Sequence, residues 1–298
     1  MHLIRAATLT SSDLDRTVAW YTKWLDYVVV EDDRLHADVA ESWNAPRAGW
    51  KRSVVLRPAS GRNVFLRFVE QEPHPDYEPL KTYGWNAVEI CTQDTDAVNA
   101  RMMEGPFEII GPPKKIAGLD AIYPMQVMGP DREVVYLTQI NEDLPQYDLP
   151  RASSLIDSLF ILVAGSPDMQ AHLDWLEDAL LLSPGRTMEI DYTMINKAHG
   201  LPGGTQHALA TVTHGRDCFL EIDQYPPGST VRPRREGELY PGIAVATFHH
   251  PDFDAVLEKS GATAVTPPGI VYGGKRAFTT ASPDGTLYEI VETEGPKT

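Results

Sequence analysis

The sequence predicts an α+β fold built from four copies of a strand–helix–three-strand unit. Two pairs of segments carry the repeat. Segment 61–68 (GRNVFLRF) matches 215–222 (GRDCFLEI), and segment 94–98 (DTDAV) matches 252–256 (DFDAV). The offsets between copies are 154 and 158 residues, so the copies keep step over more than half of the chain. A repeat of this kind indicates units that stack or pair to complete a core.

The first unit is predicted from its alternation of strand and helix patterns. Residues 3–10 form a short strand pattern, and Ser11 to Asp15 then supply a helix cap with acidic residues in the first turn. One buried helical stripe follows at Leu14, Val18, Tyr21 and Leu25. The remaining strands are expected at 27–30, 53–57 and 64–69.

The second unit repeats this order after a proline-rich connection at 70–83. A strand is expected at 87–92 and a helix at 94–102, ended by Gly105. Three strands follow near 107–110, 122–127 and 133–140. Residues 141–153, with two prolines and mixed charge, are predicted to link the two halves of the chain.

The second half restarts with a strand at 155–163 and a cap at Ser166-Pro167-Asp168, with the proline at the first helical position. The fourth unit ends in a Pro-Asp-Gly turn at 283–285 and a strand in which Leu287, Glu289 and Val291 share one face. A carboxylate among apolar face-mates needs a partner, a metal or a chemical role. The alternative is a half-exposed strand with Glu289 on its solvent-exposed face.

Composition excludes several classes of function. The formal net charge of the 298-residue chain is −16, which disfavours nucleic acid and anionic membranes as partners. No apolar run reaches the roughly 18 residues of a membrane span, and the first residues lack the apolar core of a signal peptide. We therefore expect a soluble, cytoplasmic protein. Cys91 and Cys218 lie in apolar strand patterns, where buried reduced thiols are the default.

Four such units, with Asp-x-Asp helix starts and a closing Pro-Asp-Gly-x-x-x-Glu pattern, resemble the vicinal oxygen chelate superfamily. That superfamily includes glyoxalase I, the bleomycin resistance proteins and the type I extradiol dioxygenases. The resemblance implies units paired into two cup-shaped mixed sheets, with consecutive units forming each domain. We expect an N-terminal domain at 1–145 (units 1–83 and 84–145) and a C-terminal domain at 150–298 (units 150–235 and 236–298).

The resemblance also implies metal ligands on the first and last strands of each unit. In the C-terminal pair the last-strand positions are Glu221 and Glu289. The first-strand positions, counted back from the helix caps, fall at Ser158 or Asp157 and at Ile243 or Ala244, none of which is a histidine.

The N-terminal pair offers a divalent cation no anionic ligand, because its matching positions read Ala6, Arg67, Trp85 or Asn86, and Tyr136. The region before the last turn, Ile270 to Thr279, also lacks the histidine of the extradiol pattern. No cofactor is therefore expected. The resemblance leaves room for a divalent metal (Fe, Mn, Zn or Ni), which would use Glu221 and Glu289.

Without a cation, Glu221 and Glu289 facing one another would raise one carboxyl pKa and act as an acid–base pair. His207, at a strand start, is the third catalytic candidate, as a proton shuttle. The alternative is a structural ion pair with Arg or Lys. Substrate-binding candidates are Ser158, Tyr272, Arg67 and Tyr136.

Two long segments, 32–50 and 191–204, exceed hairpin length and are expected to be lids or binding loops. Trp43, Trp50 and Tyr192 in or beside them suit an aromatic or hydrophobic ligand. The first hypothesis is an enzyme of lyase or isomerase type acting on such a small molecule. The alternatives are a non-catalytic binding or resistance protein, and a dioxygenase or glyoxalase-like metalloenzyme. Exposed sheet edges leave a homodimer open.

Overall fold

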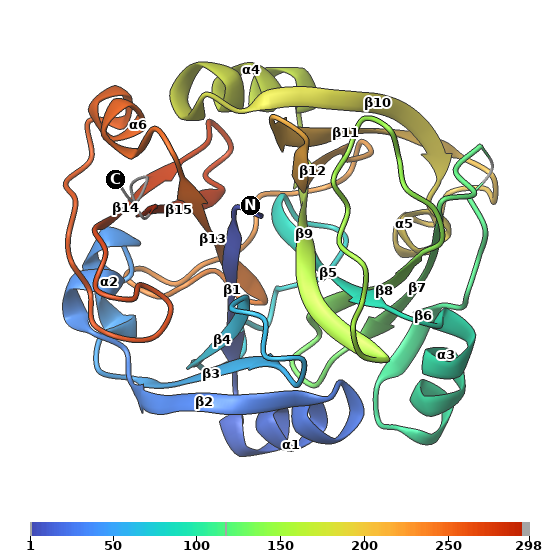
Figure 1. Ribbon diagram of the computed structural model, residues 1–298, viewed down its shortest axis with the longest axis horizontal. Coiled ribbons are helices and arrows are strands. Elements are labelled where there is room, and N and C mark those ends of the chain that lie inside the picture. The colour runs from blue at the N-terminus through green and yellow to red at the C-terminus, as the bar shows by residue number, and fades with distance from the viewer. Residues whose placement is uncertain (1, 117, 294–298) are drawn as a thin grey trace.

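The computed structural model describes residues 2–116 and 118–293 and contains the four expected units (Figure 1). The first unit comprises β1 (Ile4–Ser11), α1 (Leu14–Trp24), β2 (Tyr27–Arg34), β3 (Arg52–Pro58) and β4 (Phe65–Glu70). The second comprises β5 (Gly84–Thr92), α3 (Thr95–Glu104), β6 (Glu108–Gly111), β7 (Ile122–Met128) and β8 (Val134–Ile140).

The third unit comprises β9 (Ile156–Ser166), α4 (Met169–Leu180), β10 (Ser183–Asp191), β11 (Gln206–His214) and β12 (Asp217–Gln224). The fourth comprises β13 (Ile243–His250), α6 (Phe253–Ser260), β14 (Ala277–Ala281) and β15 (Leu287–Glu292). It has two strands after its helix where three were expected, and an isolated bridge between Val265 and Ala277 stands in place of the third.

The units pair in an order that differs from the expected one. One sheet has seven strands in the order β14-β15-β13-β1-β4-β3-β2, and the other has eight in the order β10-β11-β12-β9-β5-β8-β7-β6. The first unit thus shares a sheet with the fourth, through antiparallel pairing of β1 with β13, and the second shares a sheet with the third, through β5 and β9. The prediction that consecutive units complete each cup is wrong, because both sheets join the two halves of the chain.

The two sheets pack back to back and each curls around a core of its own (Figure 1). The largest apolar cluster lies between the sheets and under the helices, and includes Leu9, Val88, Leu162 and Phe248 from the four first strands. Two smaller clusters lie on the opposite, concave faces. We call these faces the seven-strand cup and the eight-strand cup. Ligand sites are therefore to be sought in the cups, because the shared face is filled.

Local sequence signals explain the helix starts. Asp13, Asp94 and Asp168 cap α1, α3 and α4, and each side chain accepts a hydrogen bond from the backbone N–H three residues on. Pro167 precedes the cap of α4 and is not its first helical residue, as had been expected. No helix among the described residues has the length and apolar character required to cross a membrane.

The two long segments expected as lids are partly helical. Residues 32–50 continue β2 and then form α2 (Ala37–Ser42) and a short 3-10 helix, η1 (Pro46–Ala48). Segment 191–204 forms α5 (Thr193–His199). Each helical insertion follows the second strand of its unit and reaches over the cup of its own sheet (Figure 1).

Candidate functional site

Each unit supplies two inward positions to its cup, and their spacing is regular. In all four units the first-strand position lies five residues before the aspartate at the start of the helix. These pairs are Thr8 with Asp13, Glu89 with Asp94, Val163 with Asp168 and Thr247 with Asp252. Each position stands opposite a last-strand residue, in the register pairs Thr8 and Arg67, Glu89 and Tyr136, Val163 and Glu221, and Thr247 and Glu289.

Four positions therefore meet in each cup. The seven-strand cup has Thr8, Arg67, Thr247 and Glu289. The eight-strand cup has Glu89, Tyr136, Val163 and Glu221.

The floor of the seven-strand cup holds a network of polar and aromatic side chains, and a smaller pocket of about 590 Å³, partly open to solvent, lies beside it. Arg67 donates to Thr8 Oγ1 at 2.9 Å and to Glu289 Oε2 at 3.2 Å. The side chains of both ion-pair partners, Arg67 and Glu289, are buried. Glu289 Oε2 also accepts from Thr247 at 2.8 Å. The guanidinium compensates the charge of this buried carboxylate, as a buried ion requires.

Two aromatic residues seal this network. The Trp43 indole N–H donates to Glu289 Oε1 at 2.8 Å, and the Tyr272 hydroxyl donates to the same oxygen at 2.9 Å. The Arg67 guanidinium lies 4.5 Å from the centroid of the Trp43 ring. Burial alone lowers the pKa of Arg67, but the neighbouring Tyr272 and Glu289 outweigh it and hold that pKa above its ordinary value. Arg67 and Tyr272, predicted to bind substrate, thus bond to Glu289, and both also line the pocket of this cup.

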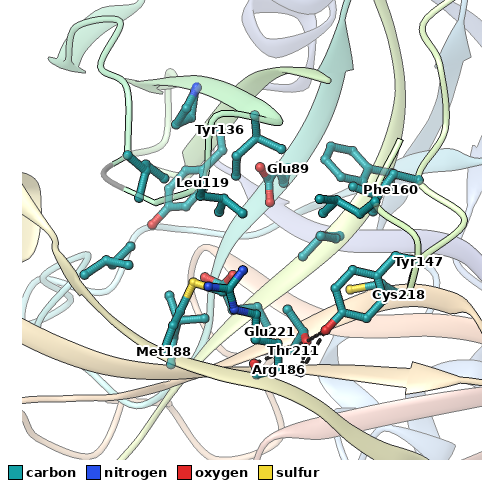
Figure 2. Close-up of a pocket in the computed structure, with 18 of the residues that line it drawn as sticks. Glu89, Leu119, Tyr136, Tyr147, Phe160, Arg186, Met188, Thr211, Cys218 and Glu221 are labelled. Atoms are coloured by element: carbon teal, nitrogen blue, oxygen red, sulfur yellow. Dashed lines mark hydrogen bonds between the residues drawn. The ribbon is translucent and has the colours of Figure 1, made fainter. Parts of the chain in front are cut away.

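The eight-strand cup contains an open cavity (Figure 2). It encloses about 800 Å³ of space, part of which is open to solvent. The walls are mostly apolar and aromatic, and two carboxylic acids, Glu89 and Glu221, point into it. The wall residues include Leu119, Ile122, Tyr136, Leu144, Tyr147, Leu149, Phe160, Ile161, Met188, Ile190, Tyr192, Leu209 and Cys218.

Glu89 is a buried acid in apolar surroundings. It is 6% exposed, and its Oε1 accepts one hydrogen bond, from the Thr138 hydroxyl at 2.6 Å. Burial and the nearby charge of Glu221 raise the pKa of Glu89 to about 8. The carboxyl is therefore mostly protonated at neutral pH. Because its pKa lies near that pH, the group can both give and take a proton.

Glu221 lies on the other side of β9, with Asp223 two residues further along the same strand face. The Tyr192 hydroxyl donates to Glu221 Oε1 at 2.5 Å. Burial raises the pKa of Glu221, and the contacts with Tyr192 and Asp223 offset part of that rise. Asp223 is 1% exposed, and burial together with the charge of Glu221 raises its pKa well above the ordinary value.

The linker between the two halves forms one wall of the cavity. Leu144, Tyr147 and Leu149 line it, together with Arg186 and Met188 from β10 (Figure 2). The Tyr147 hydroxyl accepts from the backbone N–H of Arg186 at 2.7 Å and shares a 2.8 Å hydrogen bond with Thr211. The segment that the sequence indicated only as a connection is thus part of the site.

The structure brings together a different carboxyl pair from the predicted one. Glu221 and Glu289 lie in different sheets, so they do not face one another. The neighbour of Glu221 across the cup is Glu89, for which the sequence analysis had placed Trp85 or Asn86. The strand signal used for Glu289, an acid within an apolar run, is also present at Glu89, and the five-residue spacing to the capping aspartate would have located it.

The other predicted residues fall in three places. Tyr136 lines the eight-strand cavity, as expected of a ligand contact. Ser158 is buried on β9 and lies outside the lining of that cavity. His207, the second residue of β11, bonds Asn196 Oδ1 at 2.7 Å and also lies outside the lining. Burial lowers the pKa of His207.

The donor sets at these positions do not fit the metal that the resemblance implies. In the seven-strand cup a guanidinium fills one of the four positions. In the eight-strand cup they hold two carboxyls, a phenol and a valine, with no imidazole. Across residues 2–116 and 118–293, no group of three or more His, Cys, Asp or Glu side chains is placed to hold one ion.

The sequence matches no family model and no curated protein. Solved structures match over nearly the whole chain. Glyoxalase I from maize (Zea mays) is similar over 97% of this chain and 92% of its own, with a TM-score of 0.60 and 16% identity. A Bacillus subtilis protein described as a “putative dioxygenase” is similar over 98% of this chain and 86% of its own, with a TM-score of 0.62 and 10% identity. The chain therefore has the fold of the vicinal oxygen chelate superfamily, in its four-unit, two-sheet form.

Proposed function

We propose that the protein acts on a small aromatic or hydrophobic molecule in the eight-strand cup by acid–base chemistry of the lyase or isomerase type. The observation that carries the proposal is the pair of acids, the buried Glu89 and the half-buried Glu221, in the wall of a mostly apolar cavity. A carboxyl whose pKa lies near the working pH is suited to take and return a proton.

Glu89 is the proposed proton-transferring group. Its carboxylate form would remove a proton from a carbon next to a carbonyl, and the acid that results would return the proton at a neighbouring atom. The pKa of the Tyr136 phenol is raised well above its ordinary value by burial and by the surrounding acids, so the phenol keeps its proton. It would then donate a hydrogen bond to the ligand oxygen on which negative charge develops.

Glu221 has a supporting role in this proposal. Its charge is one cause of the raised pKa of Glu89, and the hydrogen bond from Tyr192 keeps its carboxyl in place. Glu221 is therefore a positioning and electrostatic residue unless the ligand reaches it directly. Glu289 has no part in this chemistry, because Arg67 neutralises it in the other cup.

A carbon acid provides the test. We expect the protein to accelerate exchange of the α-hydrogens of 2-tetralone with deuterium in D₂O, followed by proton NMR, with a rate that saturates in ketone concentration. Glu89→Gln should remove the acceleration and keep ketone affinity within about threefold, since the amide retains the shape of the acid. Glu104→Gln, at the exposed end of α3, makes the same change of side chain away from the cavity and serves as the matched control.

The second candidate is a non-catalytic binding protein, and the lining favours it by being apolar and aromatic over most of its area. The same variants decide between the two. Binding of 2-tetralone without accelerated exchange in the wild-type protein would favour binding alone. Absence of both binding and exchange would overturn the assignment of this cavity as the site.

A further inference from the structure

We infer that the ligand of the eight-strand cup carries a basic nitrogen beside its apolar rings, that Glu89 and Glu221 receive the resulting cation, and that Asp223, buried next to Glu221, supports them. The inference rests on the proposed function, because it takes this cavity as the binding site. It adds the chemical class of the ligand.

The first argument is an excess of hydrogen-bond acceptors on this side of the cavity. Three carboxyl groups, the buried Glu89 and Asp223 and the half-buried Glu221, meet only two hydroxyl donors, Thr138 on Glu89 and Tyr192 on Glu221. Asp223 lies outside the cavity lining, receives no hydrogen bond from a hydroxyl or N–H group of the described residues, and contacts the carboxyl of Glu221. Buried acceptors without donors are costly, so a ligand that brings N–H groups would satisfy what the protein leaves open.

The second argument is the lack of a counter-charge. Within the described part of the chain, none of Glu89, Glu221 and Asp223 takes part in a salt bridge. Arg186 lines the cavity from an exposed position on β10. In the other cup, by contrast, the buried carboxylate of Glu289 has an internal counter-charge, the guanidinium of Arg67.

The third argument is the aromatic character of the walls next to these acids. Tyr136, Phe160 and Tyr192 all line the cavity, and Glu89 lies between Tyr136 and Phe160 in Figure 2. Aromatic ring faces attract ammonium groups, and the attraction is strongest where water is excluded. Acid and aromatic groups together therefore favour an organic cation.

An ammonium ion also fits the placement of the acids better than a metal ion does. The three carboxyls do not form a metal-binding group, and a metal needs ligands that converge at about 2.0 to 2.6 Å. An ammonium group reaches its acceptors through separate N–H bonds of about 2.7 to 2.9 Å. It can thus contact acids on different strands.

A pair of probes with one ring system tests the inference. Calorimetry at pH 7.5 should show 2-aminotetralin binding at least about tenfold more tightly than 2-tetralol, as expected for a buried charge-assisted contact. Glu221→Gln and Asp223→Asn should each reduce this preference and leave 2-tetralol affinity within about threefold. Glu104→Gln should keep the preference, because it changes only the net charge of the protein.

The outcomes separate this inference from the proposal beneath it. Equal affinity for the amine and the alcohol would overturn the cation and leave the site intact. If both Glu221→Gln and Asp223→Asn keep the preference for the amine, the preference comes from the net charge of −16, and the inference is also overturned. If neither probe binds, the cavity is not the site, and both statements fall.

Discussion

Arg67 and Glu289 form a buried ion pair, 3.2 Å between Nη2 and Oε2, at last-strand positions whose counterparts in the other cup are Glu221 and Tyr136. The two cups thus use the same pair of inward positions in different ways. In the seven-strand cup the charges cancel and aromatic rings cover them. In the eight-strand cup two acids, Glu89 and Glu221, line an open cavity. The difference assigns structural and functional roles to the two cups.

Replacing Arg67 by Met should destabilise the protein by about 3 to 5 kcal/mol, because it leaves the carboxylate of Glu289 buried without a counter-charge. The double variant Arg67→Met with Glu289→Leu should recover part of this loss. Urea unfolding measures both. Arg52→Met breaks an exposed pair with Asp15 and Asp32 and should cost about 1 kcal/mol or less. A similar loss for Arg67→Met and Arg52→Met would contradict the structural role of the buried pair.

Much of the fold could be predicted because its signals are local. The capping aspartates, the helix stripes and the turn at 283–285 each depend on a few neighbouring residues. Helices α1 and α3 begin directly after the aspartates that predict them, while α4 begins two residues after Pro167. Which units share a sheet depends on edge-to-edge pairing of first strands. All four first strands are similarly apolar, so local sequence does not distinguish β1 beside β13 from β1 beside β5.

The site was predicted less completely for the same reason. Glu221 and Tyr136, two of the predicted residues, line the cavity, since a turn fixes the position of each last strand. Glu289 was assigned to the wrong cup because its cup depends on unit pairing. Glu89 was missed because first-strand positions were counted too far back from the helix caps. The acceptor–donor imbalance around Asp223 is invisible in sequence, because it depends on which side chains the strands bring together.

Stability should fall as pH rises from about 5 to above 8, and Glu89→Gln should reduce this fall. The pKa of Glu89 is about 8 in the folded protein against about 4.3 in an unfolded chain, so the folded state binds the proton more tightly. Its contribution is fully present below the unfolded pKa and is lost as pH rises through the folded pKa. The size is a few kcal/mol at about 1.4 kcal/mol per unit of pKa difference.

Urea unfolding at pH 5.5 and 8.5 checks this pH dependence. Glu133, with a pKa raised to about 7, and the raised pKa values of Glu221 and Asp223 act in the same direction, so the slope of Glu89→Gln should be reduced and not abolished. Glu104→Gln should retain the wild-type slope. A wild-type slope in Glu89→Gln would mean that Glu89 is ionised in the folded state.

Tyr147→Phe should loosen the linker wall of the cavity. It removes the hydroxyl that joins Thr211 to the backbone N–H of Arg186 and leaves that contact to Thr211 alone. We expect a loss of about 1 kcal/mol in stability, faster hydrogen exchange over 144–149, and weaker binding of 2-tetralol. Tyr123→Phe removes an exposed hydroxyl that bonds Asp96 and is the control. Unchanged exchange over 144–149 would show that the hydroxyl does not hold the wall.

Inserting a large side chain should distinguish the eight-strand cup, with its open cavity, from the packed core of the seven-strand cup. Leu209 on β11 lines the cavity, so the indole of Leu209→Trp has space to occupy, and stability should change by less than about 1.5 kcal/mol. Val55 on β3 belongs to the packed core of the seven-strand cup, where Val55→Trp finds no such space and should cost about 3 kcal/mol or more. Since the indole would fill the site, Leu209→Trp should also lose 2-tetralol binding by at least about tenfold, measured by calorimetry. Retained binding in a folded Leu209→Trp protein would place the ligand outside this cavity. Equal destabilisation by Leu209→Trp and Val55→Trp would show that the eight-strand cup is packed as tightly as the seven-strand cup.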